Sequence, residues 1–478
     1  MKRIILTVAV MAISASIQAK VKLPSVFSDN MVLQQKENVA VWGKADGKKV
    51  TITTSWSKKK TVVTPEADGN WFVRLATPEA GGPYTITFSD GEKTTLRNVL
   101  TGEVWYCSGQ SNMEMPMKGF AGQPVEHAAE FIMSASPRVP IRICEVPNVK
   151  MAVPADTTRA VWKENTPEIV ARTSAVAYFF AIRMHQALNV PIGLIIADWG
   201  GSAIESWLCR EVIEGEFPGE FDTSVLDSGD IRERPNTSTP CILYNGMVAA
   251  LEPFTFKGML WYQGETNRPR PQQYVRLQAA YVRMMREKFH NPGAPFYFVQ
   301  IAPYPYQPQY QNLFTAGYFN EAQQKTLSLI PHSGMVATGD LGSFSTIHPP
   351  KKKEIGDRLA FMTLVNDYGL KGIDPAPPTF SSVEFGEGEA IVIFDTDSAG
   401  PAPLNQELGG FEIAGQDRVF HPAHAIIKDK KVRVWSIDVP NPVAVRYCFR
   451  NWSNASVFNA WGIPAVPFRT DNWDDLRE

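Results

Sequence analysis

The middle of the chain, from about residue 100 to residue 368, alternates short apolar runs with stretches of helical periodicity. Helical spacing occurs at 172–190, 271–290 and 351–368, where apolar residues recur every three or four positions. Buried strands that alternate with amphipathic helices are typical of a parallel sheet covered on both faces. The sequence therefore predicts an α/β fold, whose strands are expected at 104–107, 192–197, 258–262, 295–301 and 333–338.

Both flanks of this region have β character. Before residue 98, alternating runs such as Trp71–Leu75 are separated by turns containing Gly, Asp or Pro, which indicates a small β-sandwich. Strand-like runs return after residue 375, for example at Ala390–Phe394. We therefore expect an N-terminal β-domain at 20–98, a central domain at 99–373 with a β insertion near 140–163, and a C-terminal β-region at 374–478.

The first residues have the features of a targeting segment. Lys2 and Arg3 precede the apolar run Ile4–Ile13, and small residues follow up to Ala19. This order is typical of a secretory signal peptide cleaved near Ala19. The run is shorter than the roughly 18 residues that a membrane-spanning helix needs, and no later stretch is long enough. We therefore expect a cleaved signal peptide at 1–19, a secreted or periplasmic protein, and no membrane span.

Charge and motif content exclude several classes of function. Lys and Arg number 47 and Asp and Glu 49, so no basic excess favours nucleic acid as a partner. No glycine-rich nucleotide motif is present, the five cysteines form no CxxC pair, and the seven histidines have no zinc-site spacing. The sequence predicts no cofactor and no metal, and it makes no prediction of oligomeric state.

Three apolar strands end in polar turns that contain glycine. We call Gly109–Met113 the first turn, Asp198–Ser202 the second turn and Gln263–Asn267 the third turn; a fourth segment, Ile347–Pro349, precedes the last helix. Loops at the carboxyl ends of parallel strands converge on one crevice. Together these segments supply a hydroxyl, backbone N–H groups, an amide and an imidazole, which are the groups that acyl transfer requires. Each alone is better explained as a cap or a turn, but their order favours a site.

These segments resemble the sequence blocks of SGNH-type carbohydrate esterases, most closely those of the sialate O-acetylesterase family. The matching stretches are Gly109–Met113, Trp261–Asn267 and Ile347–Pro349, together with Leu23–Gln34 and Asn98–Trp105. The resemblance spans nearly the whole mature chain. It implies an SGNH-hydrolase-like three-layer α/β/α domain with a parallel sheet, an N-terminal β-sandwich-like domain and additional C-terminal β-structure.

The resemblance also implies roles for individual residues. Ser111 is the expected nucleophile, and His348 is the general base that takes its proton and later activates water. The N–H of Ser111, the N–H of Gly201 and the side-chain amide of Asn267 are the expected oxyanion hole. Three polar residues beside them are expected either to bind sugar hydroxyls or to brace the loops: Gln110, Gln263 and Glu265.

One position departs from the family pattern. Many SGNH enzymes have an aspartate three residues before the histidine, where this chain has Ser345. An acid at that position orients the imidazole and stabilises its cation. The alternatives are a Ser–His dyad, an acid from elsewhere with Asp340 as the first candidate, or a backbone carbonyl. Asp340 is equally explained as a turn cap.

We therefore expect a secreted, metal-independent serine esterase that removes acetyl groups from a carbohydrate, with an O-acetylated sialic acid as the first substrate. The alternatives are an esterase for acetylxylan or a similar polysaccharide, and a carbohydrate-binding protein whose catalytic site is degenerate. A sialic acid carboxylate requires an arginine partner. Arg268 and Arg270 flank the third turn, and the sequence selects neither.

Overall fold

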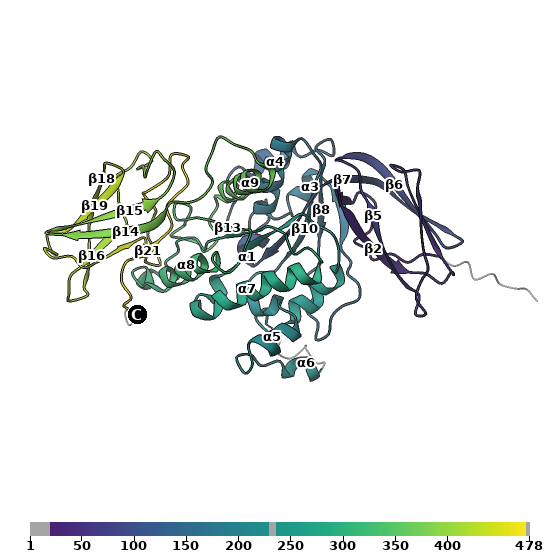
Figure 1. Cartoon of the computed structure of the whole chain (residues 1–478), viewed down its shortest axis with the longest axis horizontal. Helices are drawn as coiled ribbons and strands as arrows, with labels where there is room; N and C mark the ends of the chain where they lie inside the picture. The colour runs from purple at the N-terminus through teal and green to yellow at the C-terminus, as the bar shows by residue number, and fades with distance from the viewer. Residues whose placement is uncertain (1–19, 229–235, 475–478) are drawn as a thin grey trace, which may run out of the picture.

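The computed structural model describes residues 20–228 and 236–474; the expected signal peptide, residues 1–19, lies outside the described residues. Three parts follow one another along the long axis (Figure 1). An α/β part occupies the centre, an N-terminal β part lies at one end and a C-terminal β part at the other. The predicted fold class is confirmed.

The central sheet has the strand order β13-β12-β11-β7-β10-β8-β9. Neighbouring strands are parallel, apart from the antiparallel edge pair β8–β9. The predicted insertion near 140–163 supplies this edge, because β8 and β9 belong to the sheet itself. The bounds are β7 Lys93–Gly109, β8 Ile141–Glu145, β9 Val161–Glu164, β10 Ile192–Asp198, β11 Gly258–Tyr262, β12 Phe296–Val299 and β13 Ser333–Val336.

Helices cover both faces of this sheet (Figure 1). On one face α4 (Ala175–Leu188) and α9 (Lys352–Tyr368) pack on side chains such as Trp105 and Leu194. On the other face α7 (Pro271–Lys288) and α8 (Thr315–Thr326) pack on side chains such as Trp261. The shorter helices are α1 Ser111–Glu114, α2 Ala128–Ser134, α3 Pro167–Val170, α5 Arg210–Glu216 and α6 Ser224–Ser228. Within the described ranges, no helix combines the length and the apolar character that crossing a bilayer requires.

Strand β7 joins the N-terminal part to the central sheet. Its first half pairs with β6 and β1, and its second half lies between β10 and β11. The expected boundary between residues 98 and 99 therefore falls inside one continuous strand that ends two residues before Ser111. The N-terminal strands are β1 Val32–Gln34, β2 Asn38–Lys44, β3 Val50–Thr54, β4 Lys60–Val63, β5 Asn70–Ala76 and β6 Gly81–Ser89.

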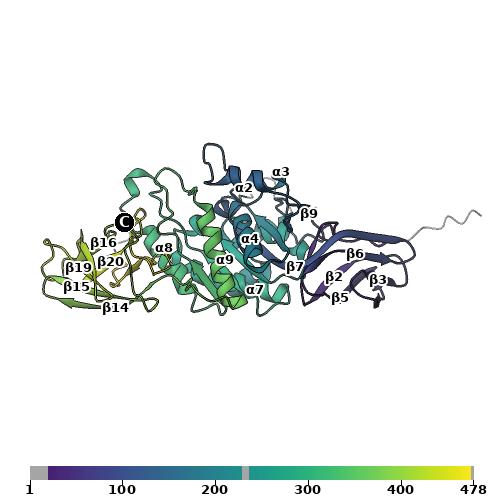
Figure 2. The same cartoon turned by 90° about the horizontal axis from the view of Figure 1, so that it is seen from above.

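The C-terminal part contains two four-stranded sheets around a core of its own (Figure 2). Their orders are β14-β15-β19-β18 and β17-β16-β20-β21. The loop after β20 contacts the central part, where Asn451 N donates to Leu313 O at 2.7 Å. The bounds are β14 Thr379–Gly386, β15 Glu389–Asp395, β16 Phe411–Ala414, β17 Phe420–Pro422, β18 His424–Lys428, β19 Lys431–Trp435, β20 Ala444–Tyr447 and β21 Phe468–Arg469.

Candidate active site

Ser111 is the first residue of α1, at the carboxyl edge of the central sheet. The turn before it depends on Gly109, whose φ is 146°. A Cβ atom on Gly109 would lie 2.1 Å from the carbonyl oxygen of Tyr262. Only glycine therefore allows β7 to approach β11 so closely at this point. The sharp turn leaves the Ser111 side chain half-buried, at the mouth of the sheet.

His348 meets Ser111 from the loop between β13 and α9. Its Nε2 atom lies 2.8 Å from the Ser111 Oγ atom, and its ring packs edge-on against Phe120 at 5.1 Å between centroids. This distance is hydrogen-bonding distance for a nucleophile and its base. The structure thus brings together the two residues that the sequence placed in different segments, 237 positions apart.

The other ring nitrogen of His348 contacts a glutamine. Nδ1 lies 2.7 Å from Gln123 Oε1, and the Thr346 hydroxyl donates to the same oxygen at 2.8 Å. The Thr346 hydroxyl in turn accepts the His348 backbone N–H at 3.1 Å. With Oε1 as the acceptor, the ring proton lies on Nδ1 and leaves Nε2 free to accept the serine proton. A neutral amide thus occupies the position of the triad acid, and sequence reasoning missed it.

Asp340, the first candidate for that acid, lies elsewhere. Its two carboxylate oxygens accept hydrogen bonds from Arg358 of α9, at 2.7 and 2.6 Å. Both nitrogens of the His348 ring are occupied by Gln123 and Ser111. The expectation that Asp340 orients the imidazole is therefore wrong, because the ion pair with Arg358 holds this carboxylate. Ser345 is exposed, and its hydroxyl contacts Ser343.

Two backbone N–H groups beside Ser111 are available to a substrate oxyanion. A Cβ atom on Gly200 would lie 3.3 Å from the Ser111 Cβ atom, so the second turn lies directly against Ser111. The N–H of Gly200 is occupied, because it donates to Glu114 Oε2 at 2.7 Å. Among the described residues, no acceptor meets the N–H of Ser111 or of Gly201. These two groups can therefore face the charge that develops on a carbonyl oxygen.

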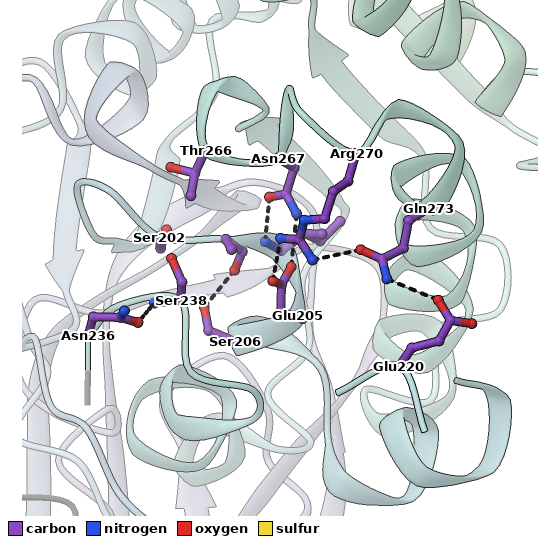
Figure 3. A network of polar contacts seen from close by, with 12 residues as sticks. Ser202, Glu205, Ser206, Glu220, Asn236, Ser238, Thr266, Asn267, Arg270 and Gln273 are labelled. Carbon is purple, nitrogen blue, oxygen red and sulfur yellow. Dashed lines mark hydrogen bonds and ion pairs between the residues drawn. The ribbon is translucent and has the colours of Figure 1, made fainter. Parts of the chain in front are cut away.

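Asn267, the third expected donor, is 0 % exposed. Its Nδ2 atom donates to Glu205 Oε2 at 2.8 Å (Figure 3). Its Oδ1 atom accepts from Ile204 N at 3.0 Å and from Gln263 Nε2 at 2.7 Å. The structure therefore places Asn267 in a buried network behind the second turn, with no surface that a substrate can touch. Its expected role as an oxyanion donor is corrected to a role in holding the loops.

The three polar residues named as sugar-binding candidates also connect loops. Gln110 Oε1 accepts from Gly264 N at 3.1 Å, and Gln263 Nε2 donates to Ser202 O at 3.1 Å. Glu265 Oε1 accepts from Asn112 Nδ2 at 2.6 Å. These contacts support the alternative in which the three residues hold the loops in place. Within the described chain, the Gln110 Nε2 atom has no hydrogen-bond partner. Its N–H groups are therefore available as donors.

A buried lysine influences the electrostatics of the site. Lys352 is 0 % exposed, and its Nζ atom donates to Asn112 Oδ1 at 2.5 Å. Burial lowers the pKa of Lys352 to about 7, against the opposing effect of Glu265. Burial raises the pKa of Glu265, although Asn112, Lys352 and Arg268 all lower it. Burial, and then the charge of Lys352, lower the pKa of His348 to about 4. The imidazole is therefore neutral at neutral pH, in the form that accepts a proton.

In the described part of the chain, imidazole and carboxylate groups converge as potential metal ligands at Glu126, His127 and Glu354. Ser111 and His348 do not belong to this group, and two of its three residues are exposed.

Comparison with known proteins identifies the family. Residues 101–364, more than half of the chain, match the family model of carbohydrate esterases described as sialic acid-specific acetylesterases. The chain belongs to this family. The mouse sialate O-acetylesterase is 26% identical over 92% of this chain and 93% of its own length, and the human sialate O-acetylesterase is 28% identical over 76% and 74%.

A solved structure supports a carbohydrate acetylesterase fold over nearly the whole chain. A novel carbohydrate acetylesterase from Xanthomonas citri aligns with a TM-score of 0.84 and 32% identity, over 95% of this chain and 100% of that one. The resemblance inferred from the sequence is thus confirmed. The chain is a carboxylic ester hydrolase, and its substrates are O-acetylated carbohydrates.

Proposed function

We propose that this sialic acid-specific acetylesterase family member removes acetyl groups from an O-acetylated sialic acid by a Ser111–His348 mechanism. The observation that supports the proposal most directly is the 2.8 Å contact between Ser111 Oγ and His348 Nε2. Ser111 Oγ attacks the acetyl carbonyl carbon while Nε2 takes its proton, and the oxyanion faces the N–H groups of Ser111 and Gly201.

The imidazolium then returns this proton to the departing sugar oxygen, which leaves as a hydroxyl and forms the acetyl-enzyme. A water molecule enters, His348 takes one of its protons, and the resulting hydroxide attacks the acetyl carbon. Collapse of the second oxyanion releases acetate and restores Ser111 Oγ, which regains its proton from His348. Gln123 keeps the ring in the required tautomer through the Nδ1–Oε1 contact, without the negative charge of a triad acid.

One arginine beside the third turn supports a sialic acid over a neutral sugar. Arg270 is held by Glu205, because Nη2 lies 2.6 Å from Oε1. Arg268 instead stacks on the ring of Tyr306 with its Cζ atom 3.2 Å from the centroid. Within the described residues, its buried Nε and Nη1 atoms have no hydrogen-bond acceptor. Buried donors without partners need an explanation. We assign this acceptor to the carboxylate of a sialic acid, which a neutral xylan lacks. Because the Nε and Nη1 atoms are buried, the Arg268 side chain has to turn away from Tyr306 to meet it.

The substrate proposal is tested by measuring acetate release from 9-O-acetylated sialic acid and from acetylated xylan. We expect turnover of the sialic acid ester with the higher kcat/KM. Turnover of the xylan alone would favour the polysaccharide esterase. Sugar binding with no turnover of either ester would favour the degenerate carbohydrate-binding protein.

Replacing Arg268 with glutamine is expected to raise KM for 9-O-acetylated sialic acid by about tenfold or more, since hydrogen bonds to charged groups contribute about 1.5–3 kcal/mol. The uncharged ester 4-nitrophenyl acetate should retain its kcat and KM. Arg276→Gln is the matched control, because Arg276 is an exposed residue of α7 that pairs with Glu220. An equal rise of KM for both esters, or an unchanged KM for both, would contradict carboxylate recognition by Arg268.

We also propose that the mature enzyme acts outside the cytoplasm, on the basis of the signal-peptide pattern at residues 1–19. N-terminal sequencing of the exported protein tests this proposal. A mature chain beginning at Lys20 is expected, and full-length protein retained in the cytoplasm would contradict it.

A further inference from the structure

A buried carboxylate lies directly behind the second turn. Glu205 belongs to the short helix η1 (Ile204–Trp207), and its side chain is 4 % exposed. Both of its oxygens are occupied: Oε2 accepts from Asn267 Nδ2 at 2.8 Å, and Oε1 accepts from Arg270 Nη2 at 2.6 Å (Figure 3). We propose that Glu205 is a positioning residue, which holds the third turn against the second and thereby fixes the Gly201 N–H opposite Ser111.

The contacts around Glu205 connect the two turns at several points. Gln263 Nε2 donates to Ser202 O at 3.1 Å, and Ile204 N donates to Asn267 Oδ1 at 3.0 Å. Gln263 and Asn267 also bond to each other at 2.7 Å. These side chains are buried away from water, where an unmade hydrogen bond is costly. The segment that follows Gly201 is therefore fixed by side chains whose geometry depends on the Glu205 carboxylate.

The Gly201 N–H lies between two anchored points of the backbone. On one side, the neighbouring Gly200 N–H is held by Glu114. On the other side, the Ser202 carbonyl and the Ile204 N–H are held by Gln263 and Asn267. Gly201 itself has a φ of 69°, in the left-handed region that glycine adopts without strain. Loss of the second anchor would free this peptide group to move away from the oxyanion position.

Arg270 supplies the charge that makes the buried carboxylate tolerable, since a buried charge requires a partner. Its Nη1 atom donates to Gln273 Oε1 at 2.6 Å, and Gln273 Nε2 donates to Glu220 Oε2 at 3.0 Å (Figure 3). This series of contacts runs from the buried end, at Asn267, to the surface, at Glu220. Glu205 is the member that joins it to the second and third turns.

An oxyanion donor acts as charge develops in the transition state, so its displacement lowers kcat more than it changes KM. The proposal rests on the proposed function, because it requires the Gly201 N–H to face the oxyanion. It predicts that Glu205→Gln lowers kcat for acetyl ester hydrolysis by about tenfold to a hundredfold, while KM changes by less than about threefold. Binding of deacetylated sialic acid should be unchanged.

The experiment combines steady-state kinetics with inhibition by phenylboronic acid, whose tetrahedral adduct with Ser111 places an oxygen at the oxyanion position. The inhibition constant should rise in Glu205→Gln in parallel with the loss of kcat. Glu216→Gln is the matched control, because Glu216 also pairs with an arginine, Arg283, at the surface. If Glu205→Gln does not fold, Arg270→Lys retains the charge on a shorter side chain that cannot reach both Glu205 and Gln273, and a smaller loss of kcat is expected.

The possible results distinguish a failure of the positioning role of Glu205 from a failure of the proposed esterase function. A Ser111→Ala variant with full activity would overturn the serine mechanism, and the role of Glu205 with it. An inactive Ser111→Ala variant together with wild-type kcat and boronate inhibition in folded Glu205→Gln would overturn the positioning role alone. A raised KM at unchanged kcat in Glu205→Gln would also overturn it.

Discussion

Replacing Ser111 with alanine is expected to lower kcat for acetate release by about 10⁶-fold, which is the loss found when a serine hydrolase loses its nucleophile. The Oγ atom of Ser111 makes the 2.8 Å contact with His348, and alanine removes the atom that attacks the acetyl carbon. The backbone N–H of residue 111 stays in place, so the residual activity measures the contribution of the oxyanion hole. Acetate release from 9-O-acetylated sialic acid and from 4-nitrophenyl acetate provides the measurement.

Ser345→Ala is the control for this variant. Ser345 occupies the position where many related enzymes have the triad acid, yet it is exposed and its hydroxyl contacts Ser343. We expect its kcat and KM to equal those of the wild type. Ser111→Ala with retained turnover would show that another group attacks the ester. A wild-type protein that binds the sugar without turnover would instead support a degenerate site.

The elements that carry Ser111 and His348 could be predicted because their signals are local. The apolar runs at 192–197 and 258–262 form β10 and β11, and the periodic stretches form α4, α7 and α9. Helix α8 was not predicted, because its buried face includes polar residues. Gln323 of α8 is 0 % exposed and exchanges hydrogen bonds with Ile301 N and Val299 O at the end of β12. A polar side chain with such partners gives no apolar periodicity.

The partners of the candidate site residues could not be predicted, because they depend on contacts between distant loops. Gln123 meets His348 across 225 positions, and no local pattern marks a glutamine as an imidazole acceptor. Asp340 is close to His348 in sequence, but Arg358 holds its carboxylate. Asn267 matches the family motif, yet Glu205 holds its amide in the interior. The only sequence signal for these unexpected contacts is the serine at position 345, which indicates that the usual triad aspartate is missing.

Replacing Gln123 with alanine is expected to lower kcat by about a hundredfold, at the lower end of what general acid–base catalysis contributes. The reason is that Gln123 Oε1 fixes the Nδ1–H tautomer through its 2.7 Å contact, and alanine leaves the ring free to reorient. Gln123→Glu retains an acceptor at this position and adds a negative charge. We expect this variant to stay active at pH 8, with a changed pH dependence.

The direction of the change in pH dependence of Gln123→Glu follows from the pKa of His348. Burial and the charge of Lys352 lower this pKa to about 4. A carboxylate on Nδ1 favours the imidazolium, so Gln123→Glu raises this pKa. The acidic limb of kcat/KM, which reports the free enzyme, should move from near pH 4 toward neutral pH. The variant should therefore lose activity at pH 5, where the wild type retains it.

Gln186→Glu, on the exposed surface of α4, provides the matched control and should leave the acidic limb in place. An unchanged limb in Gln123→Glu, together with full activity in Gln123→Ala, would show that another group orients the ring. A wild-type limb near pH 6.5 would show that burial does not control the imidazole. With the expected result, the neutral amide has a specific consequence: it keeps His348 available as a base in acid, where a carboxylate partner would hold it protonated.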